Sequence, residues 1–427
     1  MMAGKERKSP KSYRKIDWTR SRKSHPSSSI DTVPSPYNFV PLSKKVYFPD
    51  WADRISHDVP FSDGICGVID ITVEAVTPIY VRSGGVHPEK PEERLNDLKT
   101  QGFFRVHEGG GYAIPGTSFK GMLRNVVEIA SFSKMSRVDD NRYGVRDLNN
   151  PDRKLYMDHM TDSSQIGGFR SKAKAGWLSE EEKENSTEWR ICPAEFARVE
   201  VDDLIQLHPN KPHLSDQQKA FEKYNKWGQQ SLEVSFDLDP ITTHNHSCQG
   251  CGPQGHEPRQ LKLVYKKATK LNKGSLSGVI VFTGQPSAFD PKANPRQRHR
   301  KHMEFIFYNK STSTIIVPDQ IRKDFKFIHS EHSSAHSKPQ PNKEWAYWKK
   351  KLEAGEQVPV FYLEDKNGKL SSMGLAMMFR LPYKNTIYDA IKNTNPDHLD
   401  PHRLDLAEAI FGRVSDQDGV RGRCTVT

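Results

Sequence analysis

The sequence predicts an α+β protein, and three observations carry this prediction. Residues 112–128 (YAIPGTSFKGMLRNVVE) read as a short strand, a Pro-Gly turn and a helix, because apolar residues then recur at helical spacing. Runs rich in Val, Ile and Phe at 65–81, 278–284, 303–308 and 358–363 have the composition of strands. A second helical pattern lies at 345–352, and the charged stretch 178–186 looks like a short exposed helix, so helices and strands alternate irregularly along the chain.

The start of the first helix is a candidate anion site. Thr117 or Ser118 is the expected N-cap, since a hydroxyl there can accept from an unpaired first-turn N–H group. Lys120 and Arg124 follow four residues apart on one face of the helix. Unpaired N–H groups, hydroxyls and two cations together suit a phosphate. The alternative is an ordinary helix start that binds nothing.

The charge balance favours a polyanionic partner. The net charge of the 427 residues is +11, and residues 1–23 supply +7 of it, through nine Lys and Arg side chains against Glu6 and Asp17. We expect residues 1–36 to form a disordered basic tail, either a solvated arm or one that attaches to RNA. We find no apolar run long enough to cross a membrane and no secretory signal. Five cysteines, an odd number in so long a chain, favour a reducing cytoplasm.

The spacing around Cys248 and Cys251 predicts a structural zinc site. A Cys-x2-Cys pair lets two thiolates bind one tetrahedral ion, and Cys251-Gly-x2-Gly-His256 resembles the following ligands of a zinc knuckle. The knuckle's last position falls at Leu261, so we expect His246 as the fourth ligand, with His244 and Cys192 as alternatives. A catalytic zinc is disfavoured because no adjacent acid accompanies the site. The simpler alternative is a reduced loop without metal.

The stretch Ile-Pro-Gly-Thr-Ser-Phe-Lys-Gly-Met-Leu-Arg resembles the signature of the RAMP superfamily, the RNA-binding subunits of CRISPR effector complexes. The opening Tyr37-Asn-Phe-Val40 resembles a type III branch of this superfamily. The Gly84-Gly85 loop, and a helix expected to end at Phe411-Gly412 and to be followed by Arg421-Gly-Arg423, resemble features of RAMP proteins in general. The resemblance implies a ferredoxin-like (RRM-like) core with a large zinc-bearing insertion. We therefore expect four parts: the tail 1–36, the first core part 37–190, the insertion 191–342, and the second core part 343–427.

The resemblance also implies a function, which is to hold guide RNA within a prokaryotic, cytoplasmic ribonucleoprotein. Its expected partners are the guide RNA, the target RNA and other effector-complex subunits. No membrane partner is expected. The residues expected to contact the RNA backbone are Arg82, Ser83, Thr117, Ser118, Lys120, Arg124, Arg421 and Arg423.

A catalytic role would lie in the loop before the first helix. In related subunits that cut target RNA, an aspartate of this loop is needed, and Asp97 is the only aspartate between Gly85 and Ile114. Its carboxylate could accept the ribose hydroxyl proton or help to hold Mg²⁺. Glu89, Glu92 and Glu93 are alternatives, and all four could be solvated loop charges. The other possibilities are a scaffold without activity and a precursor-RNA processing endonuclease that uses His57 or His87.

Overall fold

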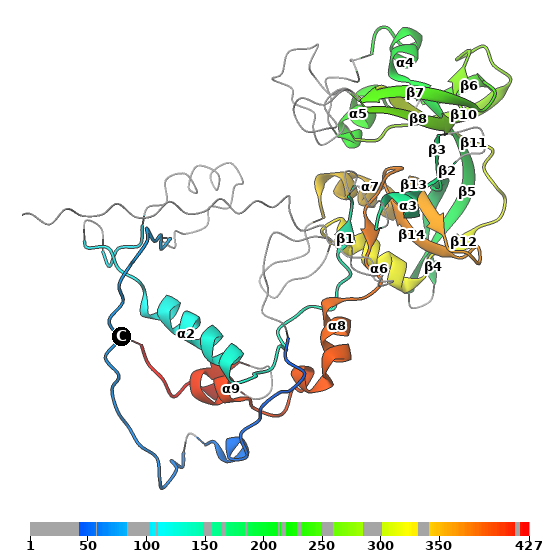
Figure 1. Cartoon of the computed structure of the whole chain (residues 1–427). Helices are drawn as coiled ribbons and strands as arrows, with labels where there is room; N and C mark the ends of the chain where they lie inside the picture. Colours follow the sequence, from blue (N-terminus) through cyan, green and yellow to red (C-terminus); the bar gives the residue numbers. More distant parts are fainter. Residues whose placement is uncertain are drawn as a thin grey trace, which may run out of the picture.

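An antiparallel sheet of nine strands organises the larger part of the chain (Figure 1). Its strand order is β14-β13-β4-β5-β11-β10-β6-β9, and β12 also pairs with β5. The long β5 pairs with β4 through its first part and with β11 through its last part, so the sheet curls along this strand. The strands are β4 (Lys174–Lys183), β5 (Ser186–Glu200), β6 (Glu233–Leu238), β9 (Ala268–Thr269), β10 (Leu276–Val281), β11 (Met303–Tyr308), β12 (Ile315–Ile316), β13 (Val358–Glu364) and β14 (Leu370–Gly374).

This computed structural model describes residues 42–56, 58–82, 103–107, 110–147, 155–163, 168–183, 186–211, 214, 219–228, 232–248, 259–284, 301–331, 341–414 and 419–426. The predicted tail 1–36 lies outside these residues. The α+β class is confirmed. In the described part of the chain, we find no helix that is long and apolar enough to cross a membrane.

Several predicted strands form close to where the apolar runs placed them. β11 has the predicted bounds and is buried on both faces, as expected for a continuous apolar strand in the middle of a sheet. One prediction was wrong, because the charged stretch 178–186 was expected to be an exposed helix and instead belongs to β4 and the start of β5. Cross-strand contacts favour the strand, since Trp189 Nε1 donates to Glu180 at 3.0 Å and Arg190 pairs with Glu181 at 2.8 Å.

Helices and aromatic side chains build the core on the sheet. Trp189, Phe325 and Trp345 meet edge to face, with ring centroids 4.8 to 5.6 Å apart. A smaller cluster contains Phe305, Phe361 and Tyr156, whose hydroxyl donates to the carbonyl of Phe379 at 2.7 Å. The core helices are α4 (Val201–Leu207), α5 (Ala220–Trp227), α6 (Asp319–Ile328) and α7 (Lys343–Glu353), of which α7 contains the predicted 345–352 helix.

A smaller sheet of four strands lies beside the first, in the order β2-β3-β8-β7. Its strands are β2 (Thr161–Ser163), β3 (Phe169–Ser171), β7 (Thr242–Cys248) and β8 (Arg259–Tyr265), with a parallel pairing between β3 and β8. The remaining short elements near the sheets are β1 (Gly144–Val145), which pairs with β15 (Leu381–Pro382), and α3 (Met157–Met160).

A third region is mainly helical and joins the two ends of the described chain (Figure 1). In it, α2 (Gly116–Ala130) packs against α9 (Leu406–Phe411), although the two are almost 300 residues apart. It also contains η1 (Ala52–Arg54), α8 (Ile387–Thr394), η4 (Pro396–Leu399) and the pair β16 (Gly412–Arg413) and β17 (Val420–Arg421).

The predicted strand at 65–81 does not form in the described structure. Residues 65–80 join no sheet, and Ile65, Val68 and Val76 are 96%, 89% and 88% exposed. Strand propensity favours an extended backbone, but a strand also needs a neighbouring edge to pair with. Only the end of the run pairs, where Phe104 N donates to Val81 O at 2.7 Å.

The large sheet crosses the predicted part boundaries. The boundary between 190 and 191 falls within β5. β11, from the predicted insertion, and β13, from the predicted second core part, are strands of the same sheet.

Candidate nucleic-acid interface

The start of α2 contacts the C-terminal glycine-rich segment, which comprises residues 412–414 and 419–426 in the described chain. The backbone of Val426 lies so close to Gly116 that a Cβ there would be 2.5 Å from the Val426 carbonyl oxygen. Lys120 Nζ similarly lies 3.2 Å from the position that a Cβ on Gly422 would occupy. Glycine therefore allows the two segments to approach at both positions.

The predicted N-cap of α2, Thr117 or Ser118, was wrong by two or three residues. The helix begins at Gly116 with Pro115 as its N-cap, and no side chain caps it. The carbonyl of Pro115 accepts from Ser118 N and Phe119 N at 3.0 and 3.1 Å. Proline's fixed φ suits the helix entry, so Thr117 and Ser118 fall inside the first turn, where both are exposed.

Arg124 links α2 to the glycine segment. Its Nε donates to Glu128 at 2.7 Å, and its Nη1 donates to the carbonyl of Gly412 at 2.9 Å. Gly412 has a φ of +89°, and a Cβ there would lie 2.6 Å from Gly422 N. These contacts show that Arg124 positions the segment from within the protein.

A buried ion pair holds α9 against the end of α2. Lys134 Nζ lies 2.9 Å from Glu408 Oε2, with side chains 2% and 8% exposed. Asp405 caps α9 by accepting from Glu408 N at 2.8 Å, and it also accepts from Lys134 N at 2.9 Å. The carbonyl of Asp400 accepts from Lys134 Nζ at 3.0 Å. Burial opposes ionisation of Asp400, but hydrogen bonds from Arg403 and from backbone N–H groups hold its pKa well below its usual range.

Six of the predicted RNA-contact residues are thus brought together. β17 carries Arg421, which pairs with Gly412 of β16. Arg423 N donates to Ile410 O at 2.8 Å, and its guanidinium lies 5.3 Å from the ring centre of Phe61. The six are Thr117, Ser118, Lys120, Arg124, Arg421 and Arg423, and of these Thr117, Ser118, Arg421 and Arg423 are exposed.

Arg82 lies at the base of the loop that precedes α2. It forms an antiparallel backbone bridge with Phe103, so these two residues lie side by side. Ser83 and Asp97, as well as the alternatives Glu89, Glu92, Glu93 and His87, lie outside the described residues. His57 does too, so the predictions made for these residues stay predictions.

An aromatic group at this loop base was not predicted. Phe103 packs edge to face with Tyr80 and Tyr112, at centroid distances of 6.2 and 5.0 Å. The Arg105 guanidinium lies 4.0 Å from the ring centre of Tyr112, which is 67% exposed. The signal was available in the sequence, since Tyr80 precedes the loop and three aromatics, Phe103, Phe104 and Tyr112, follow it before the Pro-Gly turn.

The predicted zinc ligands are only partly placed. His246 and Cys248 belong to the backbone of β7, where Cys248 is paired with Arg259 of β8. Cys251 and His256 lie in 249–258, outside the described residues. The alternative ligand Cys192 is buried in β5, where its thiol donates to Ser311 O at 2.8 Å. The described residues contain no group of three possible metal ligands, and the zinc site stays a prediction.

Comparisons with known proteins point to the same region of the chain. The model of the RAMP superfamily matches residues 72–162, a segment that includes Arg82, the loop base and all of α2. A search of curated proteins finds no match. The matched segment supports a RAMP protein, and so suggests a CRISPR-associated RNA-binding subunit.

Proposed function

We propose that this chain is a guide-RNA-binding backbone subunit of a type III CRISPR RNA-targeting ribonucleoprotein. The observation that carries the proposal is the meeting of α2 with the glycine-rich segment. It brings the helix start, with two hydroxyls and Lys120, next to the segment that carries Arg421 and Arg423. Helix N–H groups and cations bind phosphates of any sequence, so this surface suits the RNA backbone and does not read bases.

The exposed apolar run at 65–80 supports a role as one subunit among several. Its Val and Ile side chains are all exposed, the least being Ile79 at 48% and the most Ile65 at 96%. Many exposed apolar side chains within one segment are typical of a protein–protein contact. We propose that neighbouring subunits of the complex cover it.

RNA binding of the full chain tests the proposal. The double variant Lys120→Ala/Arg421→Ala should lower the affinity for a guide RNA and reduce the slope of log affinity against log salt by about 0.7 for each phosphate that the protein no longer neutralises. Fluorescence anisotropy over a salt series measures both. Lys350→Ala is the control, since Lys350 is an exposed cation on α7. A double variant with the same affinity and slope as the control would contradict the proposal.

Target-RNA cleavage through Asp97 is the second candidate. Two backbone bridges favour it. Arg82 pairs with Phe103 on either side of the stretch that contains Asp97, and Arg105 pairs with Tyr112 four residues before α2 begins. Asp97→Ala should abolish cleavage of a guide-matched target in Mg²⁺ while guide binding persists, and Glu92→Gln should cleave normally. Unchanged cleavage by Asp97→Ala would exclude this role, and cleavage of precursor RNA by the isolated chain would favour the processing alternative.

We also propose that His246, Cys248, Cys251 and His256 hold a structural zinc. The chemistry of the donor set, two thiolates and two imidazoles, suits this metal. Metal analysis of purified Cys248→Ser should show loss of bound zinc and a lower thermal midpoint. Full retention of zinc would reject the site.

A further inference from the structure

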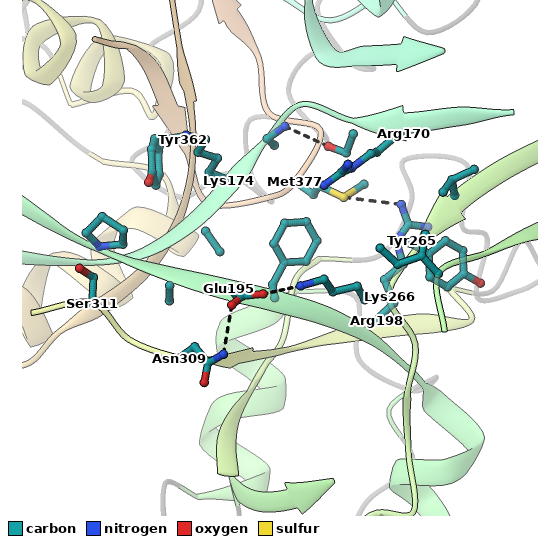
Figure 2. A pocket seen from close by; sticks show the side chains of 18 residues that line it. Arg170, Lys174, Glu195, Arg198, Tyr265, Lys266, Asn309, Ser311, Tyr362 and Met377 are labelled. Carbon is teal, nitrogen blue, oxygen red and sulfur yellow. Dashed lines mark hydrogen bonds and ion pairs between the residues drawn. The ribbon is translucent and has the colours of Figure 1, made fainter. Parts of the chain in front are cut away.

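A cleft between the two sheets has no role in the function proposed above. It encloses about 410 Å³ and is lined by β3, β4 and β5, by the end of β8 and by the chain after β11 (Figure 2). This volume falls within the usual range for small-molecule sites. The cleft lies outside the segment that matches the RAMP superfamily.

The notable residue in this cleft is Arg198, near the end of β5. Its guanidinium lies 4.4 Å from the ring centre of Tyr265, and Nη2 approaches the sulfur of Met377 at 3.6 Å (Figure 2). Its Nε is buried without a hydrogen-bond partner, and no carboxylate among the described residues pairs with the guanidinium. Burial lowers the pKa of Arg198, and only the neighbouring Tyr265 opposes this.

The nearby acids are already engaged by other cations. Glu195 accepts from Lys266 and, at 3.0 Å, from Asn309 (Figure 2). Lys174 pairs with Glu364 at 2.7 Å. Arg170 adds a further exposed cation to the lining. The cleft therefore has a surplus of positive charge.

A buried charge without a counter-charge is costly, and proteins rarely keep one that has no role. Arg190 on the same strand also has a buried Nε without a satisfied hydrogen bond, but it differs from Arg198 because acids lie beside its guanidinium. Arg190 pairs with Glu181 at 2.8 Å and with Glu188 at 2.6 Å. The counter-charge for Arg198 is therefore expected from a ligand.

The walls of the cleft indicate what that ligand carries besides its anion. Phe196, Tyr265, Val264 and Met377 line it, together with small residues of β4 and β5. An aromatic and aliphatic wall beside a cation suits a flat base attached to a phosphate. An inorganic anion alone would leave most of the volume unfilled.

We propose that this cleft binds a nucleotide, with its phosphate on Arg198 and its nucleoside against the apolar wall. The nucleotide is either free or the phosphorylated end of an RNA strand. The cleft shares no residue with the α2 surface, so nucleotide binding in the cleft can be tested independently of guide-RNA binding.

Isothermal titration of the full chain tests this with adenosine, inorganic phosphate, AMP, UMP and a 5′-phosphorylated tetranucleotide RNA. AMP or UMP should bind more tightly than both adenosine and phosphate. A preference for the tetranucleotide over AMP and UMP identifies an RNA end, and the reverse identifies a free nucleotide. Equal binding of adenosine and AMP would overturn the role of Arg198, and equal binding of phosphate and AMP would overturn the nucleoside part.

Two variants on β5 separate binding from folding. Arg198→Met should weaken nucleotide binding about 10- to 100-fold, the effect of losing a charged hydrogen bond. It should also raise the thermal midpoint of the ligand-free protein, because a partly buried charge without an acid partner is removed. Arg190→Met should lower the midpoint and leave binding unchanged. A lower midpoint for Arg198→Met with unchanged nucleotide affinity would show that Arg198 is structural and reject the proposal.

Discussion

Replacing Glu304 with glutamine should destabilise the protein strongly, because Glu304 neutralises two buried ammonium groups. Its side chain is fully buried, as is that of Lys223, whose Nζ lies 2.7 Å from Oε1. Lys301, which is 14% exposed, pairs with Oε2, and Thr283 N donates to the same oxygen at 2.9 Å. However the glutamine amide turns, its NH₂ group faces one of these donors.

The expected loss in the free energy of unfolding is about 3–5 kcal/mol, the usual cost of breaking a buried ion pair by removing one partner. Urea unfolding followed by tryptophan fluorescence measures it, since several tryptophans lie in the core on the same sheet. The control is Glu356→Gln, which removes a carboxylate 42% exposed and 2.7 Å from Lys351. An exposed pair contributes less than about 1 kcal/mol. Equal losses in the two variants would refute the reasoning.

Three further predictions concern the same buried charges and the proposed interface. Burial lowers the pKa of Lys301 from 10.5 to about 8. The cost of burying its charged ammonium group therefore destabilises the folded protein fully below pH 8, and this cost decreases as the pH rises from 8 towards 10.5. Relative to Lys301→Met, wild-type stability should therefore rise by about 2 kcal/mol between about pH 7 and about pH 9.5 in urea unfolding, and a constant difference would contradict this. Lys134→Met leaves Glu408 buried and unpaired, so amide hydrogen exchange in α9 should accelerate, whereas Lys392→Met on α8 should not change it. Gly412→Ala places a Cβ 2.6 Å from backbone atoms at a φ of +89°. This variant should bind guide RNA more weakly while its tryptophan fluorescence stays unchanged. Retained affinity would argue against the proposed interface.

Local patterns in the sequence predicted the elements that depend on neighbouring residues. The apolar spacing of 116–130 predicted α2, and the continuous apolar run of β11 predicted that strand with its bounds. The helix before Gly412 was likewise expected from its family resemblance and is α9. The patterns of α2 and β11 repeat within a few residues, so the local sequence is enough to predict these two elements.

Elements that depend on distant partners were predicted less well. The stretch 178–186 has the charged composition of an exposed helix, yet it forms β4 and the start of β5 because Trp189 and Arg190 provide partners across the hairpin. The run 65–81 has strong strand propensity, yet its residues 65–80 pair with no edge in the described chain. Propensity is a weak guide when the partner decides the outcome.

By itself, the sequence determined which residue types were available for binding phosphate, since the Pro-Gly-Thr-Ser helix start and the basic glycine-rich ending are local features. Only the tertiary structure decided how they are used. It placed Lys120 against Gly422, assigned Arg124 to a carbonyl of the protein, and left Arg198 without an acid. The physical reason is that a side chain's partners are set by chain segments tens to hundreds of residues away, whose approach no local pattern records.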